Sequence, residues 1–127
     1  MSCDYIDDGY QEPGYIAAEE GLHGPLEFEF RPILAAQRDR ANSLIQREQP
    51  QFDRFHEEAG KALAGAVKRW SITDRSGNPV PITADTLKRI KPRLLDKLWV
   101  VCTGAMTSDA RPGQAEHKID LEADAKN

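Results

Sequence analysis

Few side chains in this sequence have the types and spacing that catalysis or metal binding requires. The histidines His23, His56 and His117 are far apart, and no second histidine lies four residues from His56, the spacing of a helical metal pair. No serine lies in the Gly-x-Ser-x-Gly pattern of a nucleophile turn, and Gly77 lacks the neighbouring glycines of a phosphate-binding loop. We therefore expect a non-enzymatic protein with no catalytic residues, no metal and no cofactor.

Residues 1–25 carry six acidic residues and no basic one, together with three tyrosines at a five-residue spacing. The acidic pairs Asp7-Asp8 and Glu19-Glu20 lack the alternating ligands and central glycine of a calcium loop, so we interpret them as a solvated acidic surface. Tyrosine offers a partner a large contact area with a polar tip. The candidate partner-binding residues here are Tyr5, Tyr10 and Tyr15. A free terminus that binds nothing is the alternative.

A second set of candidate partner-binding residues is basic and falls within residues 88–97. It consists of Lys88, Arg89, Lys91, Arg93 and Lys97. A basic helix attracts phosphate groups, which makes a small nucleic-acid-binding module one hypothesis. The net charge of −4 and the nearby Asp85 and Asp96 argue against nucleic acid as the partner. In a third interpretation, the acidic segment 1–25 folds back over this basic surface and masks it.

The elements that must position these residues lie in the middle of the chain. Residues 26–104 hold 21 of the 26 Val, Ile, Leu and Phe residues, so the two ends are too poor in large apolar side chains to build a core. We therefore predict an acidic flexible arm over residues 1–25, one compact domain over 26–104 and a flexible tail over 105–127.

Apolar periodicity predicts an α+β domain that is mostly helical, with three to four helices and a small three-stranded antiparallel sheet. Helical spacing covers residues 33–48, 51–69, 83–90 and 92–102. Thr83 is the expected N-cap of the third helix, Pro92 lies in the first turn of the fourth, and Gly104 ends it.

Alternation of apolar and polar residues predicts the strands. Residues 26–30 alternate, and a hairpin follows later in the chain, with strands at 70–73 and 80–82 around a turn at 74–79. Pro79 and Pro81 lack a backbone N–H, which places 80–82 at an edge and 70–73 in the centre of the sheet.

We also predict the surroundings of five single residues. Gly60 and Gly65 lie among alanines of the 51–69 helix, so we expect another backbone to approach closely there. Trp70 and Trp99 each end an apolar stripe and are expected in the core. Cys102 is expected to be a small core residue, and a disulfide is not expected.

The longest strongly apolar run, residues 98–102, is far shorter than the roughly 20 residues of a membrane-spanning helix. The first residues are acidic, whereas a signal peptide begins with basic and then apolar residues. We therefore expect a cytoplasmic protein without a membrane segment.

The run from Trp70 to Leu87, WSITDRSGNPVPITADTL, followed by Lys91-Pro92-Arg93-Leu94, resembles the tail assembly chaperone-like group of small bacteriophage tail proteins. In that group a helix ends in tryptophan, a hairpin of the form W-x-[LI]-x-D-x-x-G-x-P-[VL]-P-[LI]-T follows, and a leucine-containing helix completes the domain. Segments 14–23 and 28–32 are also similar to members encoded in prophages. The resemblance spans roughly residues 14–104 and rests on a structural motif.

The resemblance implies a non-enzymatic assembly factor in the cytoplasm of a bacterial host. Such a factor keeps the long tape-measure protein soluble while the tail tube polymerises, so the implied partners are the tape-measure or tail tube protein. The client would need an apolar groove rimmed by charge, which the Ala/Gly-rich face of the 51–69 helix or the 94–101 face would supply. In this group the chaperone is often also made in a longer, frameshifted form. A structural tail or connector subunit is the alternative, and a homo-oligomer is left open.

Overall fold

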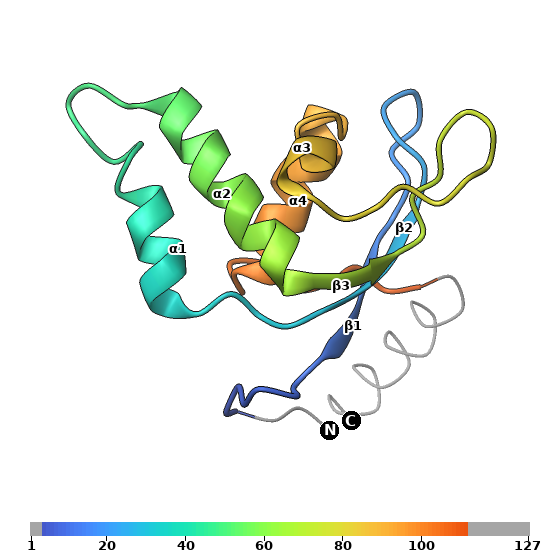
Figure 1. The fold of residues 1–127 in the computed structure, drawn as a ribbon, viewed down its shortest axis with the longest axis horizontal. Coiled ribbons are helices and arrows are strands. Elements are labelled where there is room, and N and C mark those ends of the chain that lie inside the picture. The colour runs from blue at the N-terminus through green and yellow to red at the C-terminus, as the bar shows by residue number, and fades with distance from the viewer. Residues whose placement is uncertain (1–3, 112–127) are drawn as a thin grey trace, which may run out of the picture.

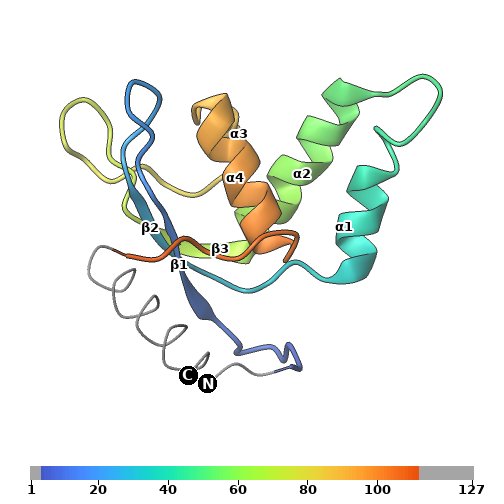
Figure 2. The ribbon, with the colours of Figure 1, turned by 180° about the vertical axis from the view of Figure 1, so that it is seen from behind.

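The computed structural model describes residues 4–111, which form an α+β fold with four helices and one three-stranded antiparallel sheet, as the sequence predicts. The elements in chain order are β1 (Glu12–Ile16), β2 (Leu26–Phe30), α1 (Ala35–Asn42), α2 (Phe52–Ala66), β3 (Val67–Trp70), α3 (Ala84–Leu87) and α4 (Pro92–Cys102) (Figure 1). The helices α2, α3 and α4 lie on the same side of the sheet in both views (Figures 1 and 2). The sheet therefore buries the face that meets these helices.

The strand order is β1-β2-β3, with β2 in the centre. Phe28 is paired with Gly14 of β1 on one side and with Trp70 of β3 on the other. The alternation predicted for residues 26–30 is confirmed, because Leu26, Phe28 and Phe30 are all buried. A register shift between Glu29 and Phe30 marks a bulge in the pairing of β2 with β3.

Two predicted strands are wrong. The strand predicted at 70–73 in the centre of the sheet is β3, which lies at Val67–Trp70 on an edge, and the strand predicted at 80–82 is not formed. Residues 80–82 do not join the sheet, and the hairpin is held by a bridge between Thr73 and Pro79 and by a hydrogen bond from Val80 N–H to the Ile72 carbonyl. The two prolines remove the donors that a longer ladder would need. The third strand is β1 instead, from the segment that the sequence analysis assigned to a flexible arm outside the domain. Ile16 of β1 is 1% exposed, so this segment contributes to the core.

The predicted helix over 33–48 is too long, since α1 ends at Asn42 and turns follow. Ser43 Oγ donates to the Arg40 carbonyl, a local bond of the kind that competes with continuing a helix. The predicted helix over 51–69 ends at Ala66, because the β-branched Val67 already pairs with Phe30 in the sheet.

The predicted start of the third helix and both ends of the fourth are confirmed, whereas the third helix ends at Leu87 and not at residue 90. Thr83 is the N-cap of α3, and its hydroxyl accepts a hydrogen bond from Thr86 N–H while Thr86 Oγ1 accepts one from Thr83 N–H. Pro92 is the first residue of α4, and Gly104 follows the helix with a φ of 79°.

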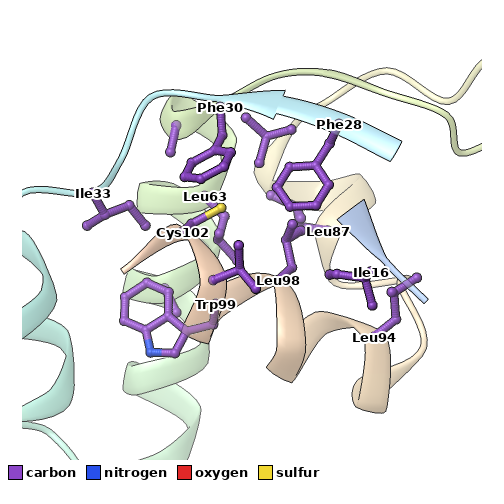
Figure 3. Packing of buried hydrophobic residues seen from close by; sticks show 14 of the residues in the cluster. Ile16, Phe28, Phe30, Ile33, Leu63, Leu87, Leu94, Leu98, Trp99 and Cys102 are labelled. Carbon is purple, nitrogen blue, oxygen red and sulfur yellow. The ribbon is translucent and has the colours of Figure 1, made fainter. Parts of the chain in front are cut away.

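The core joins β2, α2 and α4 (Figure 3). Phe28 and Phe30 of β2, with ring centroids 5.3 Å apart, belong to the same cluster as Leu63 of α2 and Leu98 of α4. Cys102 is fully buried there, as predicted, and burial raises the pKa of its thiol to about 12, so the thiol stays protonated at neutral pH.

Of the two tryptophans, Trp99 is buried as expected, whereas Trp70 is only partly buried and packs against the edge of the core. Trp70 Nε1–H donates to the Val80 carbonyl at 2.7 Å, which ties β3 to the hairpin. The tryptophan of the hairpin motif is therefore a link between two segments of chain.

The glycine with a close neighbour is Gly14, which packs against the Phe28 ring, and not Gly60 or Gly65. A Cβ atom at Gly14 would lie 2.4 Å from the Phe28 ring, whereas a Cβ at Gly60 or Gly65 would meet nothing within 4 Å. The expectation for these two α2 glycines is wrong, because α2 makes its close contacts through Ala59, Leu63 and Ala66, which are buried.

Residues 105–111, which the sequence analysis assigned to a tail, follow the outer edge of β1. Tyr15 N–H donates to Ser108 Oγ at 2.6 Å, and Ala17 N–H donates to Asp109 Oδ2 at 2.8 Å. Asp109 N–H in turn donates to the Tyr15 carbonyl at 2.8 Å. This segment therefore satisfies backbone groups that an edge strand leaves open. The rest of the predicted tail, 112–127, lies outside the described residues.

Candidate binding groove

A groove runs between α2 on one side and α3 and α4 on the other. It consists of two adjacent cavities of about 190 and about 260 Å³ that share His56, Gly60, Leu95 and Asp96. The first is completed by Phe55, Ala59, Leu63, Trp99 and Val100, and the second by Leu87, Lys88, Ile90 and Pro92. We call this surface the α2–α4 groove. Its lining is mostly apolar.

The walls of the groove are aromatic and aliphatic side chains held by the core beneath them. The rings of Phe55 and Trp99 meet edge to face, with centroids 5.7 Å apart and an interplanar angle of 87°. Trp99 points toward α2 beside the core residues Leu63 and Leu98 (Figure 3). The side chains of Phe55 and Leu95 are half-buried, so they give the groove an apolar surface that is still open to solvent.

Gly60 produces the hollow in the middle of the groove. It lies between the two cavities and has no side chain to fill the space between α2 and α4. A glycine in a helix interior costs about 1 kcal/mol relative to alanine, so this hollow is made at the expense of helix stability. The apolar face of α2 is therefore open to solvent at Gly60.

Two of the predicted basic residues are paired within the protein. Lys97 Nζ lies 2.8 Å from Glu19 Oε1, and Arg93 Nε lies 3.0 Å from Glu19 Oε2. The hydrogen bond from Lys97, supported by the one from Arg93, lowers the pKa of Glu19. The interpretation in which the acidic N-terminal segment folds back over the basic surface is therefore confirmed for Glu19.

The turn between β1 and β2 positions the Glu19 carboxylate. Glu19 and His23 exchange backbone hydrogen bonds of 3.1 Å, and Gly21 between them adopts a φ of 79°. His23 is buried in this turn. The turn therefore projects Glu19 onto the face of α4 that carries Arg93 and Lys97, away from the groove face with Leu95 and Trp99.

The other three basic residues lie at one end of the groove. Lys88 lines the second cavity and is 4.0 Å from Asp85 Oδ1, and Arg89 and Lys91 flank the lining residue Ile90. All three are exposed. Within residues 4–111, Arg89 and Lys91 form no salt bridge. We call Lys88, Arg89 and Lys91 the basic rim.

The structure does not bring the three predicted tyrosines together on one docking surface. Tyr5 is 75% exposed, Tyr10 donates its hydroxyl to Glu12 Oε2 at 2.7 Å, and Tyr15 is buried. The guanidinium of Arg111 lies 5.9 Å from the centre of the Tyr15 ring. Tyr15 therefore belongs to the contact between β1 and residues 105–111.

The sequence predicts a groove on the 51–69 face or on the 94–101 face, as alternatives. In the structure both faces line one groove, and the prediction did not identify the residues that open it. Phe55 and Leu95 have the spacing of core residues, and nothing in that spacing shows that they are only half-buried. The available signal was Gly60, a helix-interior glycine on the apolar stripe, which we interpreted as a close contact. An open groove and a close contact both favour glycine at such a position.

No group of three or more potential metal-ligating side chains occurs in residues 4–111, and none of the helices there is long and apolar enough to cross a bilayer. Comparisons of the chain with protein-family models, curated proteins and solved structures found no match.

Proposed function

We propose that this protein is a non-enzymatic protein-binding factor that holds a helical segment of another protein in the α2–α4 groove. The observation that carries the proposal is the apolar groove itself, which is open at Gly60 and lined by Phe55, Leu95 and Trp99. Amphipathic helices bind in grooves of this kind by laying their apolar face against the lining.

We propose further that the bound protein is a phage tail component, with the tape-measure protein as the client and the cytoplasm of a bacterial host as the place of action. This step rests on the resemblance of residues 70–87 and 91–94 to tail assembly chaperone-like proteins. A long protein with apolar helical stripes needs its stripes covered until the tube forms around it. An open apolar groove is suited to that task.

We expect a neighbouring reading frame to encode a tape-measure protein, and co-expression with that protein tests the proposal. We expect the client to stay soluble with the wild-type chain, and to lose about tenfold or more of its soluble yield with Gly60→Leu, which fills the groove. Gly65→Leu is the matched control, because Gly65 also lies in α2 with open space at its Cβ but does not line the groove. A client that precipitates with the wild-type chain would overturn the proposal.

The protein content of purified virions separates the proposed factor from a structural subunit. An assembly factor acts before the tail is complete, so we expect this chain to be absent from virions. A tail or connector subunit would be found there in fixed proportion to the tube protein. Binding of nucleic acid is disfavoured because Glu19 already neutralises Arg93 and Lys97.

A further inference from the structure

We propose that the helix bound in the α2–α4 groove carries acidic residues at the end that lies next to the basic rim. This inference rests on the proposed function, since it names the chemistry of the partner at the same groove. It concerns Lys88, Arg89 and Lys91, and it predicts that the partner helix binds in one direction, which the experiment below identifies.

The first step is the division of the basic residues between two faces. Arg93 and Lys97 meet the carboxylate of Glu19, so their charge is compensated within the protein. Lys88 has only the exposed Asp85 at 4.0 Å, and Arg89 and Lys91 form no salt bridge within the described residues. The uncompensated positive charge of the 88–97 segment is therefore concentrated in the basic rim.

The second step is the continuity between the rim and the apolar lining. Lys88 itself lines the second cavity, as do Ile90 and Pro92, the neighbours of Arg89 and Lys91 in the chain. A helix that lays its apolar side chains against Ile90 and Leu95 brings its end within reach of the rim. Carboxylates on that end would meet positive charge without losing any apolar contact.

The third step is the opposing charge within the groove. Asp96 and His56 line both cavities and are exposed, so the middle of the groove offers one carboxylate and one imidazole. Acidic residues in the middle of the partner helix would lie against Asp96. Acidic residues at the rim end avoid that contact, and this difference makes the preference directional.

Fluorescence anisotropy with three labelled amphipathic peptides tests the inference on the 127-residue chain. The peptides share one apolar stripe and carry glutamates at the N-terminal end, glutamates at the C-terminal end, or glutamines at both ends. We expect one of the two acidic peptides to bind about 5- to 30-fold more tightly than the glutamine peptide at low salt. The other acidic peptide is expected to bind no better than the glutamine peptide.

A triple variant, Lys88→Gln, Arg89→Gln and Lys91→Gln, should abolish the advantage of the acidic peptide. The control Arg75→Gln, at an exposed position in the turn of the hairpin, should preserve it. Equal binding of all three peptides would overturn the inference and leave the proposed function standing. If none of the peptides binds, the proposed function itself fails and the inference with it. A DNA oligonucleotide that binds through the rim, and is unaffected by Gly60→Leu, would also overturn the inference.

Discussion

Gly14 lies opposite Phe28 in the sheet, and the phenyl ring occupies the space where any other residue would place its Cβ atom. We predict that Gly14→Ala destabilises the protein by about 1–3 kcal/mol, because the new Cβ would lie 2.4 Å from the ring. Urea denaturation measures the change.

Gly65→Ala is the control for this prediction. Its Cβ would meet nothing within 4 Å, so alanine should stabilise α2 by about 0.5–1 kcal/mol. Equal stability of Gly14→Ala and the wild type would show that the Phe28 ring is free to move aside. Gly14 lies in a strand against the Phe28 ring and Gly65 in a helix beside open space, and a single sequence does not display these surroundings.

At the scale of elements, the edge of β1 is covered by the segment that carries Ser108 and Asp109. We predict that the double variant Ser108→Ala and Asp109→Ala loses about 1–3 kcal/mol of stability, because Tyr15 N–H and Ala17 N–H lose their side-chain acceptors. Urea denaturation measures the loss, and light scattering checks for association through the opened edge.

Thr107→Ala, at the exposed neighbouring position, should leave both readouts unchanged. A double variant as stable and as monodisperse as this control would mean that backbone contacts alone hold residues 105–111. Asp109 N–H, which donates to the Tyr15 carbonyl, is the backbone contact that would remain.

The elements that could be predicted from the sequence are those whose ends have local causes. Thr83 is the N-cap of α3, Pro92 begins α4, and Gly104 follows the end of α4. Each of these positions can be predicted from the neighbouring residues in the sequence. β1 could not be predicted in this way. Its sequence contains Pro13 and Gly14, which local propensity disfavours in strands, and only the distant Phe28 explains the glycine.

Like β1, the candidate groove depends on contacts between residues that are far apart in the sequence. The periodicity of α2 and α4 identifies their apolar faces, but it does not show how far apart the two helices lie. That separation depends on side chains such as Leu63 and Leu98, which pack together only in the folded molecule. The sequence therefore indicates each apolar face as a separate candidate, but not that the two faces border one groove.

At the scale of the whole molecule, Glu19 joins the turn between β1 and β2 to α4. Its pKa is lowered in the folded protein, so the ionised carboxylate stabilises the fold above the ordinary glutamate pKa of about 4.3. This contribution is lost as the pH falls through the lowered pKa. We predict that the stability difference between wild type and Glu19→Gln is present at neutral pH, declines below about pH 4.3 and shrinks at high salt.

Urea denaturation across this pH range measures the difference. Glu20→Gln is the matched control, since Glu20 is the exposed neighbour of Glu19 and forms no salt bridge within residues 4–111. A stability difference for Glu19→Gln that stayed constant with pH would show that the carboxylate acts through packing and not through charge.

Because residues 108–109 cover the edge of β1, this edge is synthesised well before the residues that cover it. The ribosome makes β1 first among the strands, and the residues that cover its outer edge come last among the described elements. Until Ser108 and Asp109 have emerged, the Tyr15 carbonyl and the Ala17 N–H have no partner from that segment. Every nascent chain therefore passes through a stage with an open strand edge, and two chains made side by side on one message can pair there before either is complete.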